Sequence, residues 1–415
     1  MNRERTVTSI SYKNKPAWFR LINSAWGSSY FLGTKIKLEK DHLIKLARKQ
    51  TGLNSFGDDF WEEPLDRLID SIKNEAELHP FGRFITRERL KGLLAIRLRA
   101  ESWFKKHPEI LEQELYPVSL ICGLQRTGTT KLHRLLAADP DNRVLSGWEA
   151  LNPVPLNEKR DEIARRMRTA RISEKALKLM APGFFSIHPV EYEKPEEDIL
   201  LLDTTFLSTT PEATMNVPSY AAWLEQTDQS YAYEYMVKLL KLLQHQRPAR
   251  RWVLKSPHHM EFLGLADKYF GGVHFIWTHR NILESLPSFI SMVAHSQTIF
   301  SDQVSLDRVA SHWVKKTGYM LSKGIEFRKA NRNVKFTDLF FEDIVASPMS
   351  VLDELYQNGL SITPALHQKF LDADRQNAPN RYGTHVYKLE DFNPDPAEWQ
   401  RTVSIYGDFL KTIPR

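Results

Sequence analysis

The sequence predicts an α/β protein with a central parallel β-sheet flanked by helices and a helical N-terminal extension. Five short apolar segments are typical of buried strands, and amphipathic helical patterns separate them. Strands and helices that alternate in this way favour a parallel sheet covered on both faces. The composition agrees, because 42% hydrophobic and 26% charged residues are ordinary for a globular protein and exclude a collagen-like or wholly disordered chain.

Residues 1–115 are expected to form the helical extension, packed on the core. Helical patterns cover residues 41–50, 61–72 and 85–105, and Gly52 is one of the breaks between them.

The α/β core is expected over residues 116–345, and residues 346–415 add C-terminal helices and a loop that complete the same domain. Its strands are expected at residues 117–122, 143–146, 251–254, 272–278 and 333–337. Helices are expected at residues 161–180, 231–245, 261–270, 281–294, 307–330 and 351–358. Ligands of such sheets bind beyond the carboxyl ends of the strands, so the residues that follow the strands are the first site candidates.

Charge and cysteine content narrow the class of protein. The 57 Lys and Arg residues exceed the 51 Asp and Glu residues by only 6, which is too little to indicate a nucleic-acid partner. The single cysteine, Cys122, excludes a disulfide framework and a thiolate metal cluster. Residues 1–15 lack the apolar stretch of a secretory signal, and the longest uncharged run, 285–301, is too short and polar to span a membrane. We expect a soluble, cytoplasmic protein.

The strongest motif is the loop Gly123–Thr130, between the first core strand and the helix after it. Two glycines let the backbone wrap around an anion, and the N–H groups at the helix start favour phosphate or a group of the same shape. The spacing is close to the GxxxxGK[ST] loop, but Thr129 stands at the lysine position, which argues against ordinary ATP or GTP chemistry. Arg126 supplies a cation instead. The alternative is a glycine turn without a ligand.

A second motif follows the strand at residues 272–278. Arg280 lies just beyond this strand, and Ser288 lies eight residues after Arg280. An arginine fork can pair with a phosphate, and a hydroxyl in the first turns of a helix can add a hydrogen bond. The alternative is a solvated arginine and a serine beside the helix break at Pro287.

Together the two motifs resemble those of sulfotransferases that use 3′-phosphoadenosine 5′-phosphosulfate (PAPS). Further segments, Thr51–Leu53, Trp148–Glu149 and Trp252–Pro257, are similar to the bacterial-type branch of that family. The resemblance implies a P-loop-like sulfotransferase fold with PAPS as the sulfuryl donor. It implies that the 3′-phosphate is held by Arg280 and Ser288, and that the 5′-phosphosulfate is held by Arg126, Thr127, Gly128, Thr129 and Thr130.

Three residues are the catalytic candidates. Lys255, at the end of the strand 251–254, is expected to stabilise the negative charge that develops on the oxygen bridging sulfur to the departing phosphate. Branches that resemble this chain place a catalytic glutamate a comparable distance after the loop, which makes Glu149 the candidate base. The alternative is that Glu149 caps the next turn or pairs with an arginine. His258 is the second candidate base, and no metal is expected because N–H groups and cations supply the charge stabilisation.

The implied activity is sulfuryl transfer from PAPS to a hydroxyl of a small-molecule, lipid or glycan acceptor, with no nucleic acid and no transmembrane segment involved. A nucleotide-triphosphate-dependent phosphotransferase and a non-catalytic nucleotide-binding scaffold are the alternatives. Apolar walls of an acceptor pocket are expected from five aromatic residues: Phe184, Phe185, Phe206, Tyr220 and Trp223.

Three further segments have weaker signals. Residues 199–203 imitate the apolar run before a Mg²⁺-binding aspartate, but Pro195 and the acids after it favour the start of a buried helix. Residues 159–178 are rich in arginine, which indicates a solvated helix face more than a polyanion clamp. His385 and Tyr387 lie where the family brings a loop over the nucleotide, although packing is the favoured explanation for them.

Overall fold

The computed structural model describes residues 6–8, 19, 21, 23–24, 36–159, 161–357, 362–377 and 384–414. Its main sheet has five parallel strands in the order β3-β4-β2-β5-β6. The strands of this sheet are β2 (Val118–Gly123), β3 (Asn142–Arg143), β4 (Arg251–Lys255), β5 (Val273–His279) and β6 (Phe336–Phe340). The predicted α/β fold with a parallel sheet is therefore confirmed.

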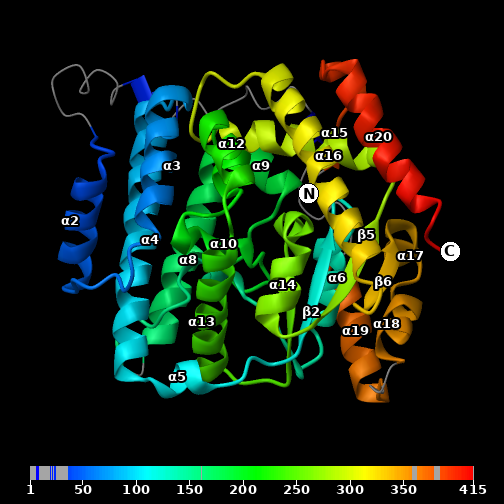
Figure 1. The fold of residues 1–415 in the computed structure, drawn as a ribbon, viewed down its shortest axis with the longest axis horizontal. Helices are drawn as coiled ribbons and strands as arrows, with labels where there is room; N and C mark the ends of the chain where they lie inside the picture. The colour runs from blue at the N-terminus through cyan, green and yellow to red at the C-terminus, as the bar shows by residue number, and fades with distance from the viewer. Residues whose placement is uncertain are drawn as a thin grey trace, which may run out of the picture.

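Helices cover both faces of this sheet and extend away from it on one side (Figure 1). The α-helices of the described residues are α2 (Lys40–Thr51), α3 (Glu62–Glu75), α4 (Pro80–Lys106), α5 (Glu109–Glu112), α6 (Thr129–Leu136), α7 (Gly147–Leu151), α8 (Glu162–Met180), α9 (Pro182–Ile187), α10 (Ile199–Leu202), α11 (Thr210–Thr214), α12 (Pro218–Gln226), α13 (Ser230–Gln246), α14 (Leu263–Phe270), α15 (Ile282–Gln297), α16 (Leu306–Ala330), α17 (Phe341–Ala346), α18 (Pro348–Tyr356), α19 (Pro364–Gln376) and α20 (Pro396–Leu410). The 3₁₀ turns are η2 (Asp203–Thr205), η3 (Pro257–Glu261) and η4 (Leu389–Asp391).

Alternate residues of the strands face two separate apolar cores, as the period of two along a strand requires. Ile121, Val253 and Ile276 pack with α6, α17, α18 and α19 on one face. Leu120 and Phe275 point to the opposite face, where the larger core lies. Burial of both faces explains why these strands read as continuous apolar runs in the sequence.

The larger core also includes the helices of the N-terminal extension, because Leu43, Leu65 and Leu94 belong to the same cluster as the strand residues. α2, α3 and α4 form the layer farthest from the sheet (Figure 1).

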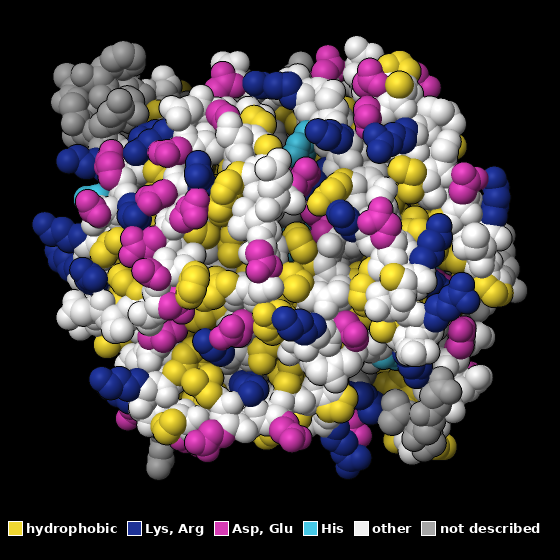
Figure 2. All heavy atoms as spheres, in the orientation of Figure 1, with side chains coloured by type: hydrophobic (Ala, Val, Ile, Leu, Met, Phe, Trp, Pro, Cys, Tyr) yellow, Lys and Arg dark blue, Asp and Glu magenta, His cyan; other side chains and the backbone are white. Residues whose placement is uncertain are grey.

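Figure 2 shows one face of the molecule, on which the side chains of basic and acidic residues are interspersed with apolar ones. Within the described part of the chain, every helix is too short or too polar to cross a bilayer.

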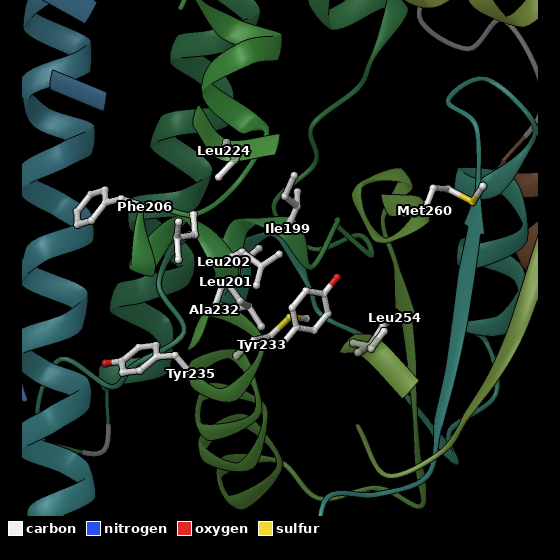
Figure 3. Close-up of a cluster of buried hydrophobic side chains, with 14 of the residues drawn as sticks. Ile199, Leu201, Leu202, Phe206, Leu224, Ala232, Tyr233, Tyr235, Leu254 and Met260 are labelled. Carbon is white, nitrogen blue, oxygen red and sulfur yellow. The ribbon is translucent and has the colours of Figure 1, made fainter. Parts of the chain in front are cut away.

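The space between α4 and β4 is filled by side chains of α10, η2, α13 and the loops beside them (Figure 3). Phe206 and Tyr235 lie on the side of this cluster that faces α4, whereas Leu254 and Met260 lie on the side of the sheet. A buried cation links α4 to α13, since the guanidinium of Arg97 lies 4.4 Å from the ring centroid of Tyr235, while it also donates to the carbonyl of Phe56 at 2.8 Å and to the Asp58 carboxylate at 2.8 Å. The extension is thus continuous with the core in its packing.

The strand order creates one switch point. After β2 the chain moves to one side of the sheet, to β3, and after β5 it moves to the other side, to β6. β2 and β5 are neighbours, with Gly123 opposite Thr278 at their carboxyl ends. In open α/β sheets a crevice for ligands forms at such a point. One of the two predicted donor-binding motifs follows β2, and the other follows β5.

Several helices and strands begin or end at other residues than the sequence predicts. α4 begins at Pro80, five residues before the predicted start, because the His79 side chain accepts from the N–H of Gly82 at 2.8 Å and caps the helix. β6 begins three residues later than predicted, because a turn with a 3.2 Å hydrogen bond from Val334 N to Asn331 O precedes it. The predicted strand at residues 143–146 is reduced to the two-residue β3.

A second sheet joins the two ends of the chain. β1 (Thr6–Thr8) pairs in parallel with β7 (Thr384–Val386), with Val7 opposite His385. The sequence analysis predicts neither strand.

Gly123 allows the tight approach of β2 to β5. Its φ is 124°, and a Cβ atom there would lie 2.5 Å from the carbonyl oxygen of Thr278. We expect Gly123→Ala to lower the free energy of unfolding by ~2 kcal/mol or more, through backbone strain and displacement of β5. Chemical denaturation measures the change. Gly92→Ala in α4 is the control, because a Cβ there meets nothing within 4 Å, and it should be neutral or stabilise by about 0.5–1 kcal/mol. Equal stability of the two variants would contradict the prediction.

Candidate active site

The loop between β2 and α6 presents backbone N–H groups to the switch point. Arg126 and Gly128 have φ values of 68° and 90°, which turn the chain sharply before the helix. The bond from Leu132 N to Gly128 O, at 3.1 Å, is the first of the helical ladder. The three N–H groups before Leu132 belong to the first turn, which has no intrahelical acceptors. With the helix dipole they favour an anion at this place.

The side chain of Thr127 is buried in the protein, whereas that of Thr130 in the same loop is exposed. Thr127 is fully buried, and its hydroxyl lies 2.6 Å from the carbonyl oxygen of Leu124 and 2.6 Å from the hydroxyl of Thr278. Thr127 therefore fastens the loop to β5. Thr129 is buried and Thr130 is exposed at the start of α6.

The two sequence motifs meet through Arg126. Its Nε donates to the Ser288 hydroxyl at 3.2 Å, and its Nη1 donates to the carbonyl of Ile187 at 3.2 Å. Arg280 donates from Nη1 to the carbonyl of Arg126 at 3.1 Å. Burial lowers the pKa of Arg126, and the nearby Arg280 charge adds to this effect. Among the described residues, the side-chain partners of this guanidinium are a hydroxyl and a carbonyl, so no carboxylate neutralises it there.

Arg280 is also half-buried, with 17% of its side chain exposed. Its guanidinium lies 4.1 Å from the ring centroid of Phe341, and it forms a 2.8 Å ion pair with Glu284 one turn along α15. Such a partly exposed pair contributes little to stability, so a phosphate could take the place of Glu284 at small cost.

Lys255 ends β4, and only 2% of its side chain is exposed. Its ammonium group forms a 2.7 Å ion pair with Glu197. Burial lowers the pKa of His188 to about 4, and the charges of Glu197, Lys255 and Arg126 also act on it. The imidazole of His188 is therefore within electrostatic range of these three groups, and it is neutral at pH 7.

Glu149 is buried, and it both pairs with arginines and caps a helix. These are the two structural roles that were the alternative to a catalytic one. Glu149 forms bonds of 2.6 and 3.0 Å with Arg143 and one of 3.0 Å with Arg247. It also accepts from the N–H of Ser146 at 3.1 Å, which completes a capping box at α7. Four donors therefore occupy its two oxygens, which leaves little room for an acceptor hydroxyl to approach them.

The neighbouring histidines belong to a separate buried cluster. His258 contacts the Thr209 hydroxyl through Nδ1 at 3.1 Å, and burial lowers its pKa well below the usual value. The charges that act on His258 are those of His259 and Lys316. His259 lies between Asp198 at 2.9 Å and Tyr233 at 2.6 Å. The structure therefore brings Lys255 and Glu197 together. His258 and His259 instead contact Thr209, Asp198 and Tyr233.

The C-terminal segment lies over the Arg126 side of the site. His385 contacts the hydroxyls of Ser288 at 3.4 Å and Ser291 at 2.9 Å. Burial lowers its pKa to about 3, and the Arg126 charge contributes. Tyr387 acts electrostatically on Arg126 as well.

The five aromatic residues expected around an acceptor lie in two groups. Phe206 and Tyr220 line an enclosed cavity beside α3 and α4, and Trp223 packs on Tyr220. Phe184 and Phe185 lie in α9, close to His188 and to Lys178 of α8. Residues 199–202 form a buried helix, as predicted, and Asp203 after it pairs with Arg89 at 2.6 Å.

Sequence reasoning missed Glu197 and His188 because neither follows a strand. The one signal for Glu197 is indirect, since a buried lysine requires a carboxylate partner.

A loop whose geometry favours an anion at the switch point, beside a second strand that an arginine follows, is typical of α/β enzymes whose ligand carries phosphate. Comparison with family profiles is more specific, because the profile described as "Sulfotransferase family" matches residues 117–362. The chain belongs to this family.

Solved structures agree with this assignment. The sulfotransferase STF1 from Mycobacterium tuberculosis is 27% identical with a TM-score of 0.74, and the match covers 90% of this chain and 99% of that one. The sulfotransferase STF9 from Mycobacterium avium, at 22% identity, has the same fold with a TM-score of 0.78, over 92% and 97% of the two chains. A search of curated proteins gave no match. The predicted sulfotransferase fold is thus confirmed.

The contacts of Glu149 predict a structural role that stability measurements can test. We expect Glu149→Ala to lower the free energy of unfolding by about 3–5 kcal/mol, because it leaves the buried Arg143 without its counter-ion. Denaturant unfolding would measure this loss. Glu63→Ala serves as the matched control, because Glu63 and its partner Arg67 are 65% and 55% exposed and the loss of such a surface pair should cost little. A Glu149 variant as stable as the unaltered protein would argue for the catalytic role instead.

Proposed function

We propose that the protein transfers a sulfuryl group from PAPS to a hydroxyl group of a small-molecule, lipid or glycan acceptor. The observation that carries this proposal is Arg126, a half-buried cation with neutral partners, joined to Ser288 at the switch point between β2 and β5. Partial burial of a charge without a counter-ion is unfavourable, and an anionic donor would relieve it.

The two ends of the donor fit two sets of residues. The N–H groups at the start of α6, with Arg126, Gly128, Thr129 and Thr130, would hold the 5′-phosphosulfate. Arg280 and Ser288 would hold the 3′-phosphate, for which Arg280 would leave Glu284 and Ser288 would share its hydroxyl with Arg126. Thr127 would contribute its backbone, because its hydroxyl already bonds within the protein.

Lys255 would stabilise the oxygen that departs. In this step a bond forms between the acceptor oxygen and sulfur, while the bond between sulfur and the 5′-phosphate oxygen breaks and its electron pair stays on that oxygen. A fixed cation in a dry site stabilises such charge strongly. The Lys255 ammonium is held at 2.7 Å from Glu197, so its position is set before the donor binds.

We further propose Glu197 as the group that accepts the proton of the acceptor hydroxyl. Glu149 is saturated with donors, and His258 belongs to the cluster of His259 and Lys316. Glu197 is adjacent to Lys255 and retains partial exposure, which leaves one side open to an acceptor. The neutral His188 beside them can donate or accept a hydrogen bond that orients this acceptor.

Donor binding is testable with adenosine 3′,5′-bisphosphate (PAP). At 100 times its Kd, PAP should stabilise the protein by about 2.7 kcal/mol, whereas AMP and ATP with Mg²⁺ should have smaller effects. Ser288→Ala should weaken PAP binding about five- to tenfold, from the loss of about 1 kcal/mol. Ser285→Ala on the same helix is the control, since its buried hydroxyl has no partner. Thermal shift titration measures both. Stabilisation by ATP with Mg²⁺ alone would favour a phosphotransferase.

The catalytic assignment predicts separate effects on turnover. Lys255→Ala should lower kcat by about 10²–10³-fold through lost charge stabilisation, and Glu197→Gln should lower it by about 10²–10⁴-fold through lost proton transfer. PAP release from PAPS, with any acceptor that supports turnover, measures both rates. Glu149→Gln is the comparison, with activity corrected for its folded fraction. Full activity of Glu197→Gln would refute this base, and full activity of Lys255→Ala would refute the charge role.

A further inference from the structure

The outer face of α8 carries an uninterrupted excess of positive charge. Its exposed basic residues are Arg165, Arg168, Arg171, Lys175 and Lys178. The helix has two carboxylates, and neither is exposed: Glu162 pairs with the buried Arg166 at 2.6 Å, and Glu174 pairs with Lys178 at 2.5 Å. Asp161, just before the helix, is an exposed acid beside this face.

Large aliphatic side chains lie on the same outer surface. Ile172 and Leu179 are 59% and 63% exposed. The positions of Arg168, Ile172, Lys175 and Leu179 repeat at intervals of three and four, so they line one side of the helix. The opposite side packs on the protein through the buried Arg166 and Ala170. The face in Figure 2 differs, because acids are mixed with the cations there.

We propose that the outer face of α8 docks on the surface of a bilayer that contains anionic phospholipid. The cations would meet the headgroups, and Ile172 and Leu179 would enter the boundary with the acyl chains, as in interfacial helices. A nucleic acid would satisfy the cations but not the aliphatic side chains, because single strands are bound by stacking on aromatic rings and duplex backbones by cations and polar groups.

The docking face continues into a basic pocket at the start of α8. This pocket has a volume of about 680 Å³ and is lined by Arg99, Lys106, Lys159 and Arg165, with Glu158 as the one acidic residue of its lining. Burial lowers the pKa of Arg99 to about 10, and the Nε of Arg99 is buried without a hydrogen-bond partner in the described residues. An anionic headgroup would give this Nε a hydrogen-bond partner and add to the counter-charge of Glu162, which already acts on Arg99.

The docking face is also connected to the active site. Lys178 of α8 lies 4.6 Å from the ring centroid of Phe185 in α9, and the carbonyl of Ile187 at the end of α9 accepts from Arg126. Glu174 accepts from the N–H of Tyr192 at 2.9 Å, in the segment that leads to Glu197. A bilayer under α8 would therefore lie next to the elements that surround Lys255.

Vesicle sedimentation with the full chain tests the docking surface without turnover. Vesicles of phosphatidylcholine with phosphatidylglycerol should bind the protein, and pure phosphatidylcholine vesicles should bind it weakly. Replacement of Arg168, Arg171 and Lys175 by alanine should weaken binding about a hundredfold at low salt, because each cation contributes about 1 kcal/mol and 1.4 kcal/mol is tenfold. Ile172→Ser with Leu179→Ser should also weaken it, by a factor that salt does not change.

The matched control replaces three exposed cations elsewhere, Lys329, Arg332 and Lys335, by alanine. This variant should bind the anionic vesicles within twofold of the unaltered protein. Equal losses in the two triple variants, or no binding to anionic vesicles, would overturn the proposal. The proposal would also fail if the variant with Ile172→Ser and Leu179→Ser bound vesicles as tightly as the unaltered protein, and the unaltered protein bound duplex DNA equally tightly. These two results together would indicate a general polyanion surface. PAP binding is expected in every variant, so failure here leaves the proposed activity intact.

Discussion

The position of β2 between β4 and β5 is the constraint on which the site depends. Main-chain bonds on both sides hold this strand in register, with Ile121 opposite Lys255 on one side and Gly123 opposite Thr278 on the other. Because parallel strands end at one edge, this register brings Arg126, Lys255 and Arg280 to the same place. A shift of one residue would turn Ile121 from one core to the other, so packing on both faces fixes the position of these cations.

The charges of the site differ in how they are neutralised. Arg143 and Glu149 form a closed buried pair, which supports the short β3 and α7 but is saturated. Lys255 has a partner with partial access to solvent, and Arg126 has neutral partners. Since removing a charge from water is costly unless it is paired, the incomplete neutralisation at Arg126 is the most informative electrostatic feature. It distinguishes a cation available to a ligand from one that stabilises the fold.

The sequence was sufficient to predict a parallel sheet covered on both faces, the helical extension and the loop after β2, because buried strands and amphipathic helices leave periodic patterns. It also identified Arg126, Ser288 and Lys255 as candidates, and the structure brings Arg126 and Ser288 into contact. The sequence alone could not distinguish a structural role of Glu149 from a catalytic one, because a capping box and a catalytic carboxylate use the same residue type. Glu197 and the pairing of β1 with β7 were missed because both depend on contacts between segments far apart in the chain, which no local pattern records.

The pairing of β1 with β7 has a consequence for the order in which the protein folds during its synthesis. Val7 is synthesised long before its partner His385, which contacts Ser288 and follows β6 in the chain. At about 5–20 residues per second, the first strand waits for ~20–75 s. During translation the core sheet can close while the cover over Arg126 is still missing. A nascent chain would therefore acquire its fold before its complete site.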